Sequence, residues 1–394
     1  MDFDDTAFEA DWRASVRSFL SGQKPPSTRE AARAWQAALH DAGFVGVTWP
    51  VEAGGRGGTP MQQAIVDQEM ARLGLPPLIN LIGIGMCGPT VIMHGTDSQK
   101  ERYLKRLLRA DDLWCQLFSE PEAGSDLAAL RTRAVRDEDA GGWRISGQKV
   151  WTTLAQLADF GILLTRTDPD VPKHRGLTMF VVDMRAPGVT VRPLRQMNGG
   201  ADFNEVFFDD VAVPDSERLG DVGDGWRVAL TTLMSERLSL GGGGTAIGPK
   251  PETVARHVAE HIGALPADRQ ALARQELGRG YVSALGARYT GYRQLSKLSR
   301  GEFPGPEASA GKLSGTQSAR DLADLAVRVL GGDARVAVTR DGDGTWQTMQ
   351  AVLPGMAIAG GSDQVLRNII GERVLGLPAE PRADKDVTFK ESLG

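Results

Sequence analysis

The spacing of hydrophobic residues changes twice along this 394-residue chain. From residue 5 to 112 they recur every three or four positions, as in Trp12 and Val16, which is typical of amphipathic helices. From residue 113 to 214, short β-branched and aromatic runs are separated by Gly, Pro, Asp and Asn, which indicates an antiparallel sheet or a small barrel. Helical spacing returns from residue 223 to 377. The sequence therefore predicts an α+β fold with a helical domain at 1–112, a β domain at 113–222, a second helical domain at 223–380 and a tail at 381–394.

The composition is that of an ordinary globular protein, and it excludes several classes of function. The net charge is −5 and the isoelectric point is near 5.7, so we expect neither a nucleic-acid scaffold nor a protein that binds an anionic membrane. The two cysteines, Cys87 and Cys115, cannot build a disulfide framework, which is typical of a reducing compartment. The most apolar window, 78–93, is too short and too interrupted by Gly and Pro to span a membrane. We therefore expect a cytoplasmic protein.

Two short motifs match known binding patterns, and each has a plainer explanation. The run 83–88 (GIGMCG) fits the dinucleotide pattern G-x-G-x-x-G, but no βαβ unit surrounds it, so we interpret these glycines as contacts between helices. His257, Glu260 and His261 fit H-x-x-E-H, in which two imidazoles one helical turn apart ligate zinc. The sequence identifies no third ligand, and charged neighbours such as Arg256 fit a solvated helix face equally well. A zinc peptidase that uses His257 and His261 is a remote alternative.

Four longer motifs follow one another through the β zone and the second helical zone. The first opens the β zone at 114–126 (WCQLFSEPEAGSD), and the second lies at 147–153 (GQKVWTT). Both combine a strand with groups that can hydrogen-bond a ligand. The third and fourth are 203–214 (FNEVFFDDVAVP) and 356–373 (MAIAGGSDQVLRNIIGER). In this order, on an α–β–α plan of this length, the four motifs resemble those of the acyl-CoA dehydrogenase family.

The resemblance implies a fold and a cofactor. The fold has N-terminal helices, a middle β-sheet or barrel domain and a C-terminal four-helix bundle, and it binds FAD non-covalently. Ser119 and Thr153 match residues that hydrogen-bond the isoalloxazine edge, and Trp151 matches a residue that packs against the ring. Donors at the flavin stabilise the negative charge that arrives with a hydride. The positions that match flavin contacts are Gln116, Phe118, Ser119, Ser125, Trp151, Thr152, Thr153, Ser362 and Gln364.

The resemblance also implies a reaction, in which an α-proton and a β-hydride leave an acyl-CoA thioester. In much of the family the base is a Glu in the C-terminal loop, but this chain has Gly360 at that position. A minority of members carry the base on the first helix of the C-terminal domain, where this chain has Glu236 before Arg237. Leu233 and Leu240 share a helical stripe with Glu236, and we expect this apolar stripe to raise the pKa of the carboxyl. The positions that match substrate contacts are Ser125, Arg237, Gly360 and Gly361.

A second interpretation is a catalytically silent subunit of a heteromeric acyl-CoA dehydrogenase. In such complexes only one of two homologous chains has a working base and bound FAD. Gly360 in place of the usual Glu favours this interpretation, and so does GPKPET at 248–253, where the family usually has Arg-x-x-Phe-Gly. That Arg reaches the FAD of a neighbouring subunit, and Lys250 is the candidate substitute for its charge. Glu236 would then form an ion pair on the helix surface.

Four consecutive glycines, 241–244, follow the segment that carries Glu236. Each Gly inside a helix costs about 1 kcal/mol relative to Ala, so the run either breaks the helix or serves a function. We predict that it widens the acyl pocket, together with Gly360 and Gly361, for a bulky or branched acyl group such as a steroid side chain. The resemblance further implies an electron-transfer flavoprotein as electron acceptor and a homo- or hetero-oligomer with a homologous chain.

Overall fold

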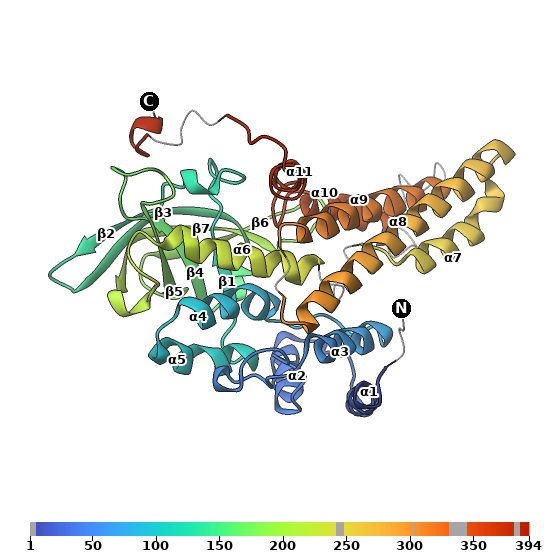
Figure 1. Cartoon of the computed structure of the whole chain (residues 1–394), viewed down its shortest axis with the longest axis horizontal. Helices are drawn as coiled ribbons and strands as arrows, with labels where there is room; N and C mark the ends of the chain where they lie inside the picture. Colours follow the sequence, from blue (N-terminus) through green and yellow to red (C-terminus); the bar gives the residue numbers. More distant parts are fainter. Residues whose placement is uncertain (1–4, 242–247, 303–304, 331–344, 382–386, 394) are drawn as a thin grey trace. The chain divides into compact units, whose positions relative to one another are not determined.

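The computed structural model describes residues 5–241, 248–302, 305–330, 345–381 and 387–393, and the side chains of 237–241 and of 393 lie outside this description. The chain divides into two compact units, which are considered separately (Figure 1). The N-terminal unit comprises Met1–Gln196, Gly200–Glu236 and Glu380–Gly394. The C-terminal unit comprises Met197–Gly199 and Arg237–Ala379. Helices precede and follow one β-sheet along the chain, so the predicted α+β class is confirmed.

The N-terminal unit begins with helices whose starts are encoded locally. Thr6, Thr59 and Thr96 each accept a hydrogen bond from the main chain three residues on, and the side chain of that residue accepts one from the threonine N–H. These reciprocal capping boxes satisfy main-chain groups that a helix start otherwise leaves unpaired. The helices are α1 (Ala7–Leu20), α2 (Arg29–Asp41), α3 (Pro60–Arg72), α4 (Gly88–His94) and α5 (Asp97–Leu108).

The glycine run at 83–88 lies in helical backbone, but Gly88 packs against Trp49, which lies in a loop and not in a helix, so its role as a contact between helices stays a prediction. Gly83–Cys87 form a π-helical turn that leads directly into α4. A Cβ atom added at Gly88 would lie 2.0 Å from the Trp49 ring, so only glycine fits there. Cys87 is a buried free thiol in the same core, as expected from the composition.

All strands of the described residues belong to one eight-stranded sheet in the order β6-β7-β3-β2-β4-β5-β8, with β1 beside β4. The expectation of an antiparallel sheet is wrong for two strand pairs: β2 pairs with β4 in parallel, with Arg133 opposite Arg166, and β1 pairs with β4 in parallel, with Trp114 opposite Phe160. The connection between them contains β2 and β3, and such a long connection allows parallel pairing. The strands are β1 (Trp114–Leu117), β2 (Arg133–Asp137), β3 (Gly142–Thr153), β4 (Phe160–Arg166), β5 (Leu177–Asp183), β6 (Val189–Leu194), β7 (Phe203–Pro214) and β8 (Arg218–Leu219).

A buried carboxylate ties α1 to α3. Glu69 is 2% exposed, and its side chain accepts hydrogen bonds from Arg13, Arg17 and Arg72. Burial alone would raise the pKa of Glu69, but the three guanidinium groups lower it from 4.5 to about 2. The charged form is therefore favoured in the folded state, and it stabilises this helix pair above pH 4.5.

Replacing Glu69 by Gln is expected to lower the free energy of unfolding of the N-terminal unit by about 2 kcal/mol at neutral pH, after allowing for the half-exposed Arg17 and Arg72. Because the folded-state pKa lies below the unfolded one, this deficit should shrink as the pH falls from 4.5 toward 2. Urea unfolding at several pH values, with the exposed Glu101→Gln as control, measures it. A deficit that is constant with pH would show that charge pairing is not its cause.

The C-terminal unit is helical and is organised around one central helix. Helix α9 contacts α7, α8, α10 and α11, and its buried residues Leu322, Leu325 and Ala326 form a core with Val254 and Val258 of α7. The zone of predicted helical spacing, 223–377, contains α6 (Gly225–Gly241), which begins in the N-terminal unit, α7 (Pro251–His261), α8 (Ala267–Ser299), α9 (Ala308–Val329), α10 (Thr345–Met356) and α11 (Asp363–Arg373).

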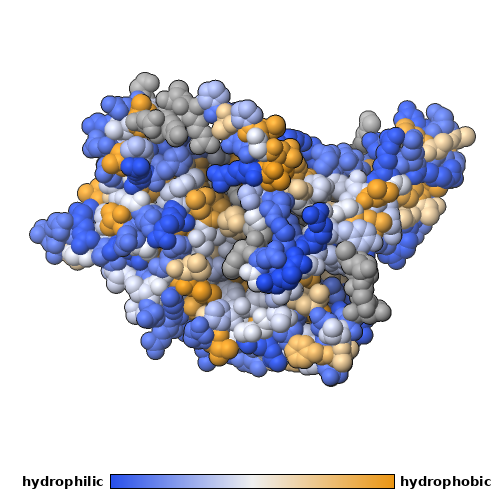
Figure 2. Space-filling view, in the orientation of Figure 1, coloured by the Kyte–Doolittle hydropathy of each residue, from blue (hydrophilic) through white to orange (hydrophobic). Residues whose placement is uncertain are grey.

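The end of the chain, predicted as a polar tail, packs on the β-sheet through one aromatic side chain. Phe389 is buried, its ring lies 3.5 Å from the Arg166 guanidinium carbon, and its N–H donates to the carbonyl of Val171. The visible face of the molecule is mostly hydrophilic, with small separate hydrophobic patches (Figure 2). In the described part of the chain, no helix combines the length and the apolar character that a membrane crossing requires.

Candidate active site

The two segments predicted to contact a flavin lie side by side in the N-terminal unit. Strand β1 ends at Leu117 and leads into Phe118 and Ser119, and the Val150 N–H of β3 donates to the Ser119 carbonyl at 2.9 Å. Gln116, the first of the predicted contacts, lies on β1 itself, half-buried, opposite Ile162 of β4. The fold therefore brings together groups that are about thirty residues apart in the sequence.

A buried ion pair fixes the loop that follows Ser119. Lys149 is fully buried on β3, and its Nζ donates to the Phe118 carbonyl at 2.9 Å and to Glu120 Oε1 at 2.8 Å. The Glu120 carboxylate also accepts from the main-chain N–H groups of Arg131 and Thr132. These bonds connect β3, the loop and the start of β2, so the loop has one fixed conformation.

The pair is ionised at neutral pH. Burial lowers the pKa of Lys149 to about 8, which still leaves the ammonium protonated at pH 7. Burial alone would raise the pKa of Glu120, but the attraction of Lys149 and hydrogen bonds from Thr132 and Arg131 lower it below its ordinary value. Neither residue is predicted as a site residue from the sequence. The available signal was a lysine inside the second motif, 147–153, and a glutamate inside the first motif, 114–126, and nothing in the sequence shows that the two side chains meet.

Trp151 and Thr152 lie near the end of β3, and the Trp151 ring is exposed, as expected of a residue that packs against an aromatic ligand. Trp151 adopts a left-handed backbone conformation with φ 60°, and its side chain is 61% exposed. Such a conformation is strained for a bulky residue, and large exposed aromatics are unusual in a packed fold. The Thr152 hydroxyl is buried, and it finds no hydrogen-bond partner among the described residues. The exposed ring fits a flavin, whose isoalloxazine offers a flat face, whereas the buried Thr152 hydroxyl is covered by protein atoms.

The other flavin contacts predicted in the N-terminal unit lie in the loop after β1 or at the end of β3. Ser119 and Thr153 are half-buried, whereas Ser125 is exposed. A Cβ atom added at Gly124 would meet nothing within 4 Å, so the loop is open on this side. Glu122, which departs from the usual Gly, pairs with Arg131 at 3.0 Å on the surface. The departure therefore leaves the buried part of the loop unchanged.

Helix α6 carries the predicted base and is anchored to α4 by two hydrogen bonds. The hydroxyls of Thr90 and Thr232 are 2.8 Å apart, and His94 Nε2 lies 2.8 Å from Thr231 Oγ1. Glu236 is half-buried and lies one helical turn after Thr232, so the two residues share one face of α6. The side chains of Arg237 and Leu240, and the residues Gly242–Gly244, lie outside the described residues.

The C-terminal unit holds the predicted glycine loop in a defined conformation. Gly360 and Gly361 have φ values of 67° and 95°, which glycine adopts without strain and a glutamate would not. The fully buried Lys312 of α9 donates to the Gly361 carbonyl at 3.0 Å and lies 3.5 Å from Asp363. Like Lys149, Lys312 is not predicted from the sequence.

Two further predicted residues begin helix α11. Ser362 is its N-cap, because its hydroxyl accepts from the Val365 N–H at 3.3 Å. Gln364 is exposed in the first turn. Lys250, the candidate substitute for the missing Arg, is exposed directly before α7.

Three family models match nearly the whole chain. They are the acyl-CoA dehydrogenase N-terminal domain at residues 6–111, the middle domain at 115–211 and the C-terminal domain at 223–375. The chain belongs to the acyl-CoA dehydrogenase family. The predicted family, its three-part fold and its class, a flavin-dependent oxidoreductase, are therefore confirmed. The family generally uses FAD.

Similar proteins are known from mycobacteria. The acyl-CoA dehydrogenase FadE34 of Mycobacterium tuberculosis is 42% identical over 347 residues, which are 87% of this chain, and the chain spans about half of that relative (46%). The acyl-CoA dehydrogenase IpdE1 of the same organism is 38% identical over 359 residues, 90% of each chain.

Solved structures of the family resemble this chain closely. The steroid acyl-CoA dehydrogenase Tcur3481–Tcur3483 is 29% identical, with a TM-score of 0.82, and covers 96% of this chain and 100% of its own. The ChsE4–ChsE5 complex of Mycobacterium tuberculosis is 31% identical, with a TM-score of 0.81, and covers 96% and 100%. The names of both proteins refer to two different chains.

Proposed function

We propose that this chain is an acyl-CoA dehydrogenase that holds FAD on the loop around Ser119 and on Trp151–Thr153. The observation that carries the proposal is the exposed, left-handed Trp151 on the strand that hydrogen-bonds the loop around Ser119. The Lys149–Glu120 pair supports it, because a buried ion pair that fixes a loop is expected where a ligand needs a preorganised site.

The residues of the chain divide the chemistry between them. Glu236 takes the α-proton of the acyl thioester, and the main-chain N–H groups of Gly360 and Gly361 polarise the thioester carbonyl. Ser125 and Arg237 contact the coenzyme A part of the substrate. FAD, when bound, supplies the acceptor for the β-hydride. Ser119 and Thr153 donate hydrogen bonds to the flavin edge, and Ser362 and Gln364 contact it from the C-terminal loop.

We propose that the acyl group is bulky or branched, such as a steroid side chain. The similarity to a structure titled steroid acyl-CoA dehydrogenase supports this choice. Glycines at 360 and 361 leave the loop without side chains, which agrees with a wide pocket. The glycines at 242–244, to which the same role was assigned, lie outside the described residues.

Anaerobic titration of the purified protein with acyl-CoA esters tests the proposal. The protein should be yellow, and a CoA ester of a steroid side chain should bleach the flavin faster than a straight medium-chain ester. A sharp preference for the unbranched ester would refute the bulky acyl group. A yellow protein that no acyl-CoA bleaches would refute the dehydrogenase activity.

A silent partner subunit is the second candidate function, and two observations favour it. Gly360 carries no carboxylate, and the two structures of highest similarity described above pair this fold with a second chain. In that case the purified chain alone should be colourless and should acquire flavin only when it is produced with a homologous chain. We further propose that the active assembly, homo- or hetero-oligomeric, passes its electrons to an electron-transfer flavoprotein.

A further inference from the structure

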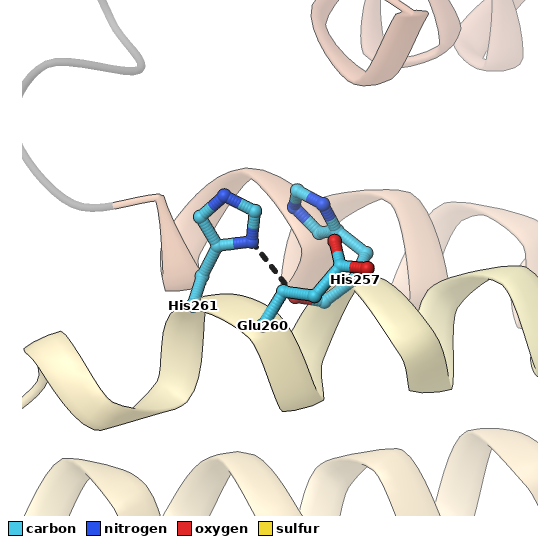
Figure 3. A group of neighbouring side chains, drawn as sticks. All are labelled: His257, Glu260 and His261. Atoms are coloured by element: carbon cyan, nitrogen blue, oxygen red, sulfur yellow. Dashed lines mark hydrogen bonds between the residues drawn. The ribbon is translucent and has the colours of Figure 1, made fainter.

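Three potential metal ligands meet on helix α7, in the C-terminal unit. His257, Glu260 and His261 lie on one helical turn, and each offers a ligand atom that is within 4.8 Å of the other two (Figure 3). The sequence identified two imidazoles without a third ligand, and the structure supplies Glu260 as that ligand. None of the three residues belongs to the proposed flavin or acyl-CoA contacts.

Hydrogen bonds prepare both imidazoles for metal binding. His257 Nε2 lies 3.0 Å from the Ala326 carbonyl of α9. His261 Nδ1 lies 2.9 Å from the His257 carbonyl, and Figure 3 draws this hydrogen bond as a dashed line. A carbonyl only accepts, so each ring directs an N–H to it, and the lone pair of the neutral ring is on the other nitrogen. Main-chain carbonyls that orient histidines in this way are characteristic of metal sites.

The positions of the rings are also fixed by packing. The His257 ring lies 4.9 Å from the Trp346 ring and 4.4 Å from the His261 ring, and both histidines are half-buried. Glu260 is exposed, so its carboxylate can move toward a metal at little cost. Two ligands of one tetrahedral zinc ion, each about 2.1 Å from it, are roughly 3.4 Å apart, so ligand atoms that lie within 4.8 Å of one another must move closer together to bind it.

We propose that His257, Glu260 and His261 bind one Zn²⁺ ion, with water as the fourth ligand. Two neutral imidazoles and one carboxylate are ligands that zinc prefers, and the charge of the complex stays low. In the H-x-x-E-H peptidases the glutamate between the histidines acts as the base. Here it is a ligand, and the hydrogen bond from His257 to the Ala326 carbonyl connects the site to α9. The site is independent of the proposed dehydrogenase reaction.

Titration calorimetry with ZnCl₂ tests the proposal on the full-length holoprotein after treatment with EDTA and desalting. The wild type should bind one ion per chain at this site, and both Glu260→Gln and His261→Asn should weaken binding at least about 10-fold. The matched control is Glu252→Gln, which removes an exposed carboxylate from the same helix and should bind like the wild type.

The proposal is overturned if the wild type binds no ion up to millimolar Zn²⁺, or if either variant binds as tightly as the wild type. Thermal unfolding provides a second measurement that does not depend on flavin or substrate. Saturating Zn²⁺ should raise the melting temperature of the wild type and of Glu252→Gln, but not that of His261→Asn. An equal rise in all three would place the ion elsewhere and would also overturn the proposal.

Discussion

Replacing Glu236 by Gln is expected to lower kcat for acyl-CoA oxidation by about 10²–10⁴-fold, because Gln cannot accept the α-proton. The substitution keeps the size of the side chain, so the protein should fold and should retain its FAD. Thr231 and Thr232 of α6 hydrogen-bond to α4, and Glu236 follows Thr232 by one helical turn. These bonds hold the helix backbone that carries Glu236 in place. Steady-state turnover with an artificial electron acceptor, measured together with the flavin content, gives the result.

Two further variants test whether the loss of turnover depends on where the carboxylate of residue 236 lies. Glu236→Asp keeps the charge but shortens the side chain, and it should have intermediate activity. Asp221→Asn removes an exposed carboxylate shortly before α6 and should leave kcat unchanged. A Glu236→Gln variant with the turnover of the wild type would exclude Glu236 as the base and would favour the silent-subunit interpretation of the isolated chain.

Replacing Lys149 by Met is expected to remove most of the bound FAD and to lower the free energy of unfolding by about 3–5 kcal/mol. The change leaves the buried Glu120 carboxylate without its ammonium partner, and the Phe118 carbonyl without its donor. The loop that carries Ser119 should then lose its fixed conformation. The ratio of flavin to protein absorbance after gel filtration measures the first effect, and urea unfolding measures the second.

The double variant Lys149→Met with Glu120→Gln separates charge from packing. Because it leaves no unpaired charge in the interior, it should recover part of the lost stability relative to the single variant. Arg131→Gln, which breaks the exposed pair with Glu122, serves as control and should cost at most about 1 kcal/mol. If Lys149→Met retains full flavin content and stability, the ion pair does not organise the loop.

The sequence carries most of the information about secondary structure, because helix starts and strand runs depend on neighbouring residues. The threonine caps at Thr6, Thr59 and Thr96 are examples of such local signals. The parallel pairing of β1 with β4 is not local, since it depends on how β2 and β3 fold between them. The expected antiparallel sheet therefore needed correction, while the α+β class did not.

The site shows the same division between local and distant signals. Sequence motifs identify Trp151 and Ser119 as candidate flavin contacts. They do not identify the side-chain interactions that fix the loops of the site. Lys149 and Glu120 meet only because two strands and a loop come together, and Lys312 reaches Gly361 from a different helix. A buried lysine and a surface lysine look alike in a single sequence, because burial of a charge depends on its partner in the fold. The roles of Glu236 and of the C-terminal glycines stay predictions.

Anaerobic stopped-flow reduction of the flavin by a branched acyl-CoA tests the central claim most directly, since it isolates the step that needs the base. We predict that the wild type is reduced in a single turnover, with a slower rate for a substrate deuterated at Cα. Glu236→Gln, loaded with an equal amount of FAD and the same acyl-CoA, should stay oxidised over the same time. Reduction of Glu236→Gln at the rate of the wild type would contradict the account.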